Sequence, residues 1–221
     1  MKQMYSRADT LLAHLKKFVR NEFNRMGLLG LDELNVLNTQ TQTEQMFIRL
    51  KQENLKIFMD AAQHAQEHAL KLVEEVKDGD TVKSDNIGSL VWITAFLAGY
   101  NKSTGYLYDS ETDRKRMRYN EEILTAREYG DRTRFNQVTE KSANLWYGQS
   151  EQYLLDTVDE ATLGTYKNNG IEYVKWMTES DDRVCKECQS RHGVIYPIDS
   201  VPDKPHRRCR CYLVPVKGKN K

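Results

Sequence analysis

Proline is scarce in this sequence and confined to one end. The 221 residues contain four prolines, all of them after residue 196. Because proline breaks helix interiors, the long proline-free part is free to form helices. No segment approaches the roughly 18 consecutive apolar residues that a membrane span needs. The first residues, MKQMYSRADTLLAHLKK, also lack the apolar core of a signal peptide. We therefore expect a protein that is made in the cytoplasm and has no membrane partner.

Neither sign of charge predominates, since the formal net charge is +1. Bulk charge therefore excludes neither acidic nor basic partners. The charge is unevenly distributed: residues 182–221 hold ten Lys/Arg and four Asp/Glu, a net charge of +6, which leaves −5 for the rest. A basic end on a mildly acidic body fits phosphate or an acidic partner, and it fits an ordinary solvated surface equally well.

The first two-thirds of the sequence predict helices. Apolar residues recur at spacings of three and four, which marks one apolar helix face. The predicted helices cover about 11–26, 41–76, a segment around Trp92 that Ser84 or Asp85 caps, a charged helix after Ser110, then 134–155 and 159–167. Residues 104–108 read as a short strand or an extended connector.

After Gly170 the pattern changes to alternation with many β-branched and aromatic residues, which predicts strands at 171–178, 193–196 and 212–216. The fold class that we expect is therefore α+β, a mostly helical body followed by a small C-terminal antiparallel β module with a Cys/His cluster.

Cysteine is rare, and all four cysteines fall between residues 185 and 211. Their spacing is C-x2-C, twenty further residues, then C-x-C, with a histidine three residues before the second pair. Two close pairs of soft ligands are what tetrahedral zinc requires. We predict a structural zinc site, with five candidates for four positions: Cys185, Cys188, His206, Cys209 and Cys211. His192 is a weaker sixth candidate.

Other readings of the cysteines remain open. They could be buried free thiols, or they could form disulfides, although the cytoplasm disfavours these. If residues 209–211 form a strand, Cys209 and Cys211 share one face; if they form a turn, His206 and Cys209 could be the second pair. His64 and His68 lie four apart on one helix face, but no third ligand lies one turn away.

Catalysis is disfavoured at the cysteine cluster. A catalytic zinc keeps an open coordination position, whereas here more than enough ligands are present to close it. The sequence has no H-E-x-x-H motif and no H-x-E paired with P-C-x-x-C. We therefore expect a protein that is not an enzyme.

The cluster resembles a known family signature. The C-terminal pattern of phage minor head proteins is similar to Trp176, Thr178, the segment Asp181-Asp-Arg-Val-Cys-Lys-Glu-Cys188, His192-Gly193, Pro205-His206 and Cys209-Arg-Cys211. These proteins are the Mu protein F-like, or head morphogenesis, proteins. Either Asp181 or Asp182 corresponds to the aspartate of that pattern. Arg207 stands where that pattern commonly has proline. Thr139-Glu140 with Asn144, and the segment 104–116, are also similar to family members, so the resemblance covers about residues 100–215.

The resemblance implies a division of the chain and a role. Residues 1–100 would be an N-terminal helical region, 101–168 the helical part of the head-morphogenesis domain, and 169–221 the β-rich Cys/His module. Family members are minor capsid proteins of the virion, and they join the procapsid interior near the portal protein. Some of them contact double-stranded DNA. The expected function is structural, in procapsid assembly and genome packaging or delivery; the alternative is a phage-derived, zinc-containing nucleic-acid-binding protein or nuclease.

Three further features have a functional and a structural reading. The segment Asp113-Arg-Lys-Arg-Met-Arg118 could touch DNA or an acidic portal surface, but nearby acidic residues favour a solvated helix face. Trp146 could anchor a partner, but its helical spacing from Phe135 and Leu154 favours the core. Trp176 precedes the first cysteine pair and is expected to pack against the metal module.

Overall fold

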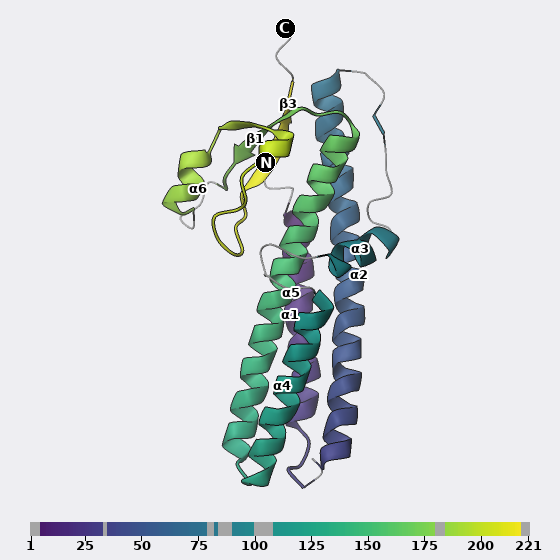
Figure 1. The fold of residues 1–221 in the computed structure, drawn as a ribbon, viewed down its shortest axis with the longest axis vertical. Helices are drawn as coiled ribbons and strands as arrows, with labels where there is room; N and C mark the ends of the chain where they lie inside the picture. Colours follow the sequence, from purple (N-terminus) through teal and green to yellow (C-terminus); the bar gives the residue numbers. More distant parts are fainter. Residues whose placement is uncertain are drawn as a thin grey trace. The chain divides into compact units, whose positions relative to one another are not determined.

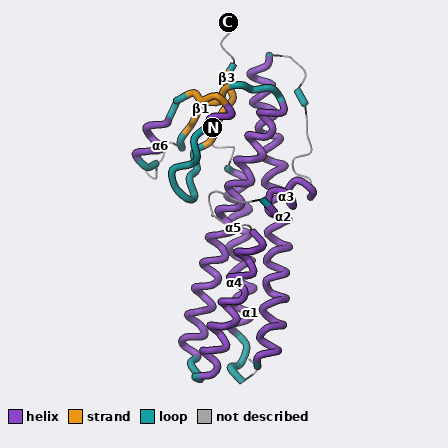
Figure 2. The backbone as a smooth tube through the Cα atoms, viewed as in Figure 1, coloured by secondary structure: helices purple, strands orange, loops and turns teal. Residues whose placement is uncertain are grey.

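A computed structural model describes residues 5–32, 35–78, 82–83, 90–99, 108–179 and 184–217. Helices make up most of these residues, and the strands all lie near the C-terminus (Figures 1 and 2). The helices are α1 (Ser6–Gly27), α2 (Val36–Lys77), α3 (Leu90–Ala98), α4 (Tyr108–Glu128), α5 (Arg132–Asn168) and α6 (Lys186–Arg191). The strands are β1 (Tyr173–Met177), β2 (Ile195–Pro197) and β3 (Tyr212–Val216). This confirms the predicted α+β class.

Four helices begin earlier than predicted. Helix α1 starts at Ser6 and α5 at Arg132, ahead of the expected residues 11 and 134. Helix α2 starts at Val36 because the side chain of Asn35 accepts a hydrogen bond from the backbone N–H of Asn38 at 2.8 Å, which caps the helix. Helix α4 starts at Tyr108, two residues before Ser110. The predicted caps at 84–85 and the predicted connector at 104–107 lie outside the described residues.

The two helices predicted at 134–155 and 159–167 are one continuous helix, α5, so that prediction is wrong. Polar side chains near the expected break bond within the helix: Gln152 Nε2 donates to Asp156 Oδ1 at 2.8 Å, and Thr157 Oγ1 donates to the carbonyl of Tyr153 at 2.7 Å. Helical backbone and satisfied side chains are therefore compatible at these positions.

The chain forms two compact units, each built from segments that are distant in the sequence. One comprises Leu11–Ile57 and Thr94–Glu151. Its core holds one aromatic side chain from each of four helices, namely Phe23 of α1, Phe47 of α2, Tyr119 of α4 and Trp146 of α5. Phe23 and Tyr119 meet edge to face with ring centres 5.3 Å apart, and Phe47 meets Trp146 in the same way at 5.2 Å. Trp146 is thus a core residue, as predicted.

The other unit comprises Met1–Thr10, Phe58–Ile93 and Gln152–Lys221, so it contains the sheet. Ala69 and Val73 of α2 pack with Tyr166 of α5 and with Val174 of β1. One face of the sheet is thereby buried against two helices. These units interleave along the sequence, whereas the ranges expected above were consecutive.

The sheet is antiparallel with strand order β2-β1-β3. Val174 in the central strand pairs with Tyr196 on one side and with Pro215 on the other. Pro197 and Pro215 both lie on edge strands, where a missing N–H costs no ladder hydrogen bond. Among the described helices, none combines the length and the apolar content that a membrane crossing requires.

Candidate metal centre

The first cysteine pair is shaped by the short helix α6. Cys185 is its N-cap residue, in an extended conformation, and its Sγ accepts a hydrogen bond from the backbone N–H of Cys188 at 3.4 Å. Cys188 lies in the first turn and is buried. This N-cap geometry brings both sulfurs of the C-x2-C pair to the same side of the turn. The helix itself was not predicted, since six residues are too few to show a periodic pattern.

The second pair follows a turn held by helix α5. Arg208 has a positive φ of 58°, and its backbone N–H donates to Gln152 Oε1 at 2.7 Å. Cys209 and Cys211 come next, in neither helix nor strand, and both are buried. Residues 207–208 form the turn, and His206 lies in the bend just before it. Of the two alternatives for the second pair, the structure groups Cys209 with Cys211 and not with His206.

Five sulfur and nitrogen ligands gather here in two groups that share one residue. Cys185, Cys188 and His206 form one group, and Cys188, Cys209 and Cys211 form the other, with the ligand atoms of each group mutually within 4.8 Å. The five site residues predicted from the sequence are thus all present, and the groups could hold a metal ion.

Two distances between candidate ligand atoms match the edges of a zinc tetrahedron. Cys188 Sγ lies 3.4 Å from His206 Nε2 and 3.6 Å from Cys209 Sγ. Bond lengths of about 2.3 Å for Zn–S and 2.0–2.1 Å for Zn–N give tetrahedron edges of roughly 3.5–3.8 Å. The donor set, thiols and one imidazole, is also the set that structural zinc prefers.

The thiols are not cross-linked. All four cysteines are free, and the 3.6 Å between the sulfurs of Cys188 and Cys209 far exceeds the roughly 2.05 Å of a disulfide. Their surroundings are apolar on one side, because Cys188, Cys209 and Cys211 form a buried cluster with Trp176. Trp176 therefore packs against the cysteines, as predicted.

Protonation differs from one thiol to the next. A hydrogen bond from the Cys211 thiol lowers the pKa of Cys209 to about 5, whereas burial raises the pKa of Cys188 to about 12. Cys211 donates that bond and is buried, so its pKa is raised. The protein thus stabilises one thiolate by its own hydrogen bonds and keeps two buried neighbours protonated. A bound cation would favour the thiolate form of all of them.

His206 is oriented as a metal ligand would be. Its Nδ1 lies 3.0 Å from the carbonyl oxygen of Arg207, which accepts its proton and raises the pKa of the ring. In the neutral ring, Nε2 then carries the lone pair, and this is the atom that faces Cys188. A second hydrogen bond that fixes the tautomer is usual for histidine ligands of zinc.

The weaker histidine candidates lie outside both groups. His192 ends helix α6, and its Nδ1 accepts from the backbone N–H of Thr178 at 3.1 Å and lies 2.7 Å from the hydroxyl of Thr178. Among the described residues, no third ligand joins His64 and His68. Burial, followed by the charge of His64, lowers the pKa of His68.

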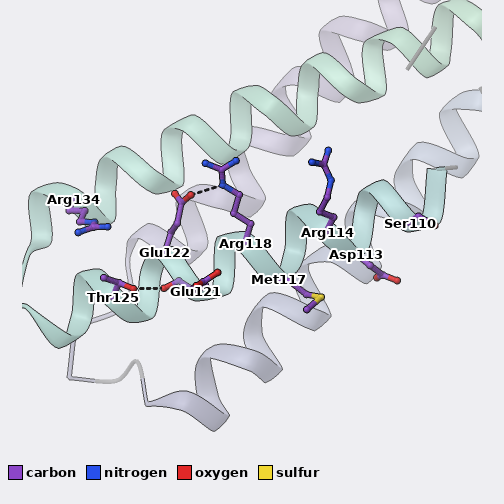
Figure 3. Close-up of a pocket in the computed structure, with 9 residues that line it drawn as sticks. All are labelled: Ser110, Asp113, Arg114, Met117, Arg118, Glu121, Glu122, Thr125 and Arg134. Carbon is purple, nitrogen blue, oxygen red and sulfur yellow. Dashed lines mark hydrogen bonds and ion pairs between the residues drawn. The ribbon is translucent and has the colours of Figure 1, made fainter. Parts of the chain in front are cut away.

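The basic segment 113–118 is a paired, solvated helix face. Arg118 donates to Glu122 at 2.7 Å, and Lys115 and Arg114 approach Glu111 at 3.4 and 3.5 Å. Figure 3 shows the open groove along this face of α4, lined by charged side chains and by Met117. None of the cysteines borders it. The favoured reading of this segment is therefore confirmed.

No sequence pattern indicated the residues that support the backbone of the second cysteine pair. Tyr5, Asp159 and Lys204 bond to one another and to the backbone of residues 209 and 211. Burial and then the charge of Asp159 raise the pKa of Tyr5. Burial opposes a charged Lys204, but Asp159 and Tyr5 more than offset it and raise its pKa. No local pattern signals a contact between residues 5 and 211, which are 206 positions apart.

Comparisons with protein-family models, curated proteins and solved structures found no match to this chain.

Proposed function

We propose that this chain is a minor head protein of a tailed bacteriophage. In this proposal it is a structural component of the virion, located inside the capsid at the portal vertex and made in the host cytoplasm. It acts in procapsid assembly and in genome packaging or delivery, and it has no catalytic role. Its partners are the portal protein and the procapsid interior.

The gathering of the signature residues is the observation that carries the proposal. The resemblance rests on residues spread over 36 positions, from Trp176 to Cys211. In the folded chain Trp176, Cys188, Cys209 and Cys211 form one cluster, and His206 touches Cys188. A pattern that arose by chance would not have to converge on one point. The convergence supports reading the pattern as a single functional unit.

Zinc is the ion that we propose for the cluster, in a structural role. Bound there, it would cross-link the residues at the start of α6 to the segment before β3 through four of the five candidates Cys185, Cys188, His206, Cys209 and Cys211. The module has little core of its own, so metal binding energy would add directly to its folding energy. Such a metal cross-link would keep a small module folded inside a crowded capsid.

The composition of purified particles tests the proposal. Procapsids and DNA-filled heads are isolated from a lysate of the phage that encodes the chain, and their proteins are identified by mass spectrometry. The chain is expected in both particles, at far fewer copies than the major capsid protein, and it should co-purify with the portal protein. An abundant host protein from the same lysate controls for carry-over. Absence of the chain from both particles would contradict the proposal.

One observation favours the alternative of a nucleic-acid-binding protein or nuclease. Arg207 and Arg208 are exposed in the turn next to the cluster, where they could meet phosphates of double-stranded DNA. A nuclease requires metal-dependent cleavage of plasmid DNA that His206→Ala abolishes. Cleavage by the wild-type chain that this substitution removes would replace the structural proposal, and intact plasmid would eliminate the nuclease.

A further inference from the structure

Tyr5, the residue just before helix α1, lies next to the second cysteine pair. Tyr5 is 1% exposed, and its hydroxyl donates to Asp159 Oδ1 at 2.6 Å and lies 3.2 Å from the carbonyl oxygen of Cys211. Asp159 belongs to helix α5. The hydroxyl of Tyr5 therefore links helix α5 to the backbone of a cysteine in the metal centre.

Lys204 makes the same kind of link to the other cysteine. Its Nζ lies 2.5 Å from Asp159 Oδ2 and donates to the hydroxyl of Tyr5 at 2.8 Å and to the carbonyl of Cys209 at 3.1 Å. The three protons of the ammonium group thus have three acceptors. Each oxygen of the Asp159 carboxylate therefore anchors one group, the Tyr5 hydroxyl or the Lys204 ammonium, that lies within hydrogen-bond distance of a cysteine carbonyl.

The residue between the two cysteines is held by α1 as well. Arg210 Nη2 donates to both carboxylate oxygens of Asp9, at 2.7 and 2.8 Å. The guanidinium of Arg210 and the ammonium of Lys204 each lie 5.4 Å from the centre of the Tyr5 ring, within cation–π range. Tyr5 therefore contacts three of the residues that hold the Cys209–Cys211 segment, namely Asp159, Lys204 and Arg210.

We infer that Tyr5 is a positioning residue for the metal centre, acting through the carbonyls and side chains that fix the Cys209–Cys211 segment. The inference rests on the proposed metal site. Hydrogen bonds are strong in a buried setting, and mobile ligands bind metal less tightly than fixed ones. By linkage, metal binding must in turn stabilise the docked first turn of α1.

A substitution that removes one hydroxyl tests the inference. Tyr5→Phe keeps the ring and its cation–π contacts but loses the bonds to Asp159, Cys211 and Lys204. Tyr119→Phe is the matched control, because Tyr119 is equally buried and its hydroxyl contacts Thr139 at 3.2 Å in the other compact unit. The zinc dissociation constant is measured by competition with a chromophoric chelator, and circular dichroism checks folding.

Loss of supporting contacts around a metal commonly costs 10- to 100-fold in affinity. We expect Tyr5→Phe to weaken zinc binding by about 10-fold and Tyr119→Phe to leave it unchanged. The absorption of bound Co²⁺, which reports ligand geometry, should also change in Tyr5→Phe alone. A role in stability without positioning would lower the unfolding free energy of both variants but leave affinity and spectrum as in the wild type.

Two outcomes separate this inference from the proposed metal site. If the wild-type chain binds no zinc, the metal site itself is refuted. If the wild type binds zinc and Tyr5→Phe binds it equally well with an unchanged Co²⁺ spectrum, only the positioning role is overturned. If Tyr5→Phe fails to fold, Lys204→Met serves as the second test, because it removes the hydrogen bond from Lys204 to the carbonyl of Cys209. An unchanged zinc affinity of Lys204→Met overturns the inference as well.

The reciprocal effect is measured by hydrogen exchange. The backbone N–H of Asp9 bonds to the carbonyl of Tyr5 at 2.8 Å and so reports on the first helical turn. Zinc is expected to slow exchange there in the wild type and to slow it less in Tyr5→Phe. If amide exchange at Asp9 in the wild type is the same with and without zinc, the coupling between zinc binding and the first turn of α1 is overturned.

Discussion

Cys188 occupies a different position from the other four ligands, because it alone belongs to both groups of three. Its sulfur lies 3.4 Å from His206 Nε2 and 3.6 Å from Cys209 Sγ. Removing any other ligand leaves one complete group, whereas removing Cys188 breaks both. The five candidates, equal in the sequence, are therefore unequal in the structure.

Cys188→Ala is accordingly expected to abolish zinc binding, while Cys185→Ala and Cys211→Ala retain it with lower affinity. Elemental analysis of protein purified without chelator measures zinc per chain, and Co²⁺ absorption reports the ligands that remain. Cys188→Ala protein that is folded and carries zinc at the wild-type ratio would refute the shared-ligand arrangement.

The pH dependence of zinc binding follows from the protonation of the Cys188 thiol. Burial raises the pKa of Cys188 to about 12, so at pH 7 it is protonated and must lose its proton to bind metal. The raised pKa of His206 acts in the same direction, since a protonated ring cannot bind. Zinc affinity should therefore fall as pH falls from 8 to 6, by at least about tenfold per unit. Isothermal titration in buffers of different ionisation enthalpy counts the released protons; affinity independent of pH would argue against thiol ligands.

At the scale of elements, the continuity of α5 matters because two points along this helix support the second cysteine pair. Gln152 and Asp159 lie on the same helix and hold the turn and Lys204, respectively. If the helix were broken near residue 157, as the sequence pattern suggested, these two supports would move independently. One rigid helix keeps the second cysteine pair in place.

Glu160→Pro tests this continuity. In an unbroken helix, proline at 160 removes a backbone hydrogen bond and clashes with the preceding turn, at a cost of about 3 kcal/mol or more. If a separate helix began at Asp159, proline at 160 would occupy its favoured first position and cost little. Glu160→Ala is the control for loss of the side chain. Urea denaturation measures both variants; equal stability of the two would contradict a continuous α5.

For the whole molecule, the two compact units have different sources of stability. The unit from Leu11 to Ile57 and from Thr94 to Glu151 rests on an aromatic core drawn from four helices. Among the described residues, the unit that contains the sheet includes one apolar cluster around Val174 and another that is built largely of cysteine. Metal binding should therefore stabilise the unit that contains the sheet and leave the stability of the other unit unchanged.

Chelation is expected to act on one unit only. With EDTA, amide exchange should quicken in residues 184–211 and in the first turn of α1, whereas the amides near Phe23, Phe47 and Tyr119 should exchange as before. Hydrogen exchange followed by mass spectrometry resolves these segments, and re-addition of zinc should restore the protection. Equal loss of protection in both units would contradict a local role of the metal.

The sequence by itself determined the helical body, the three strands and the five Cys/His residues that could hold a metal ion. Each of these depends on local spacing: apolar residues three and four apart, alternation, and close pairs of cysteines. Tertiary structure alone decided that α5 is unbroken, that Cys188 is shared between two groups, and that Tyr5, Lys204 and Asp159 support Cys209 and Cys211. The reason is physical. A side chain such as Thr157 can satisfy its polar group inside a helix or outside it, and only packing decides which. Contacts between residues about 200 positions apart leave no periodic trace along the chain, so only the folded molecule reveals them.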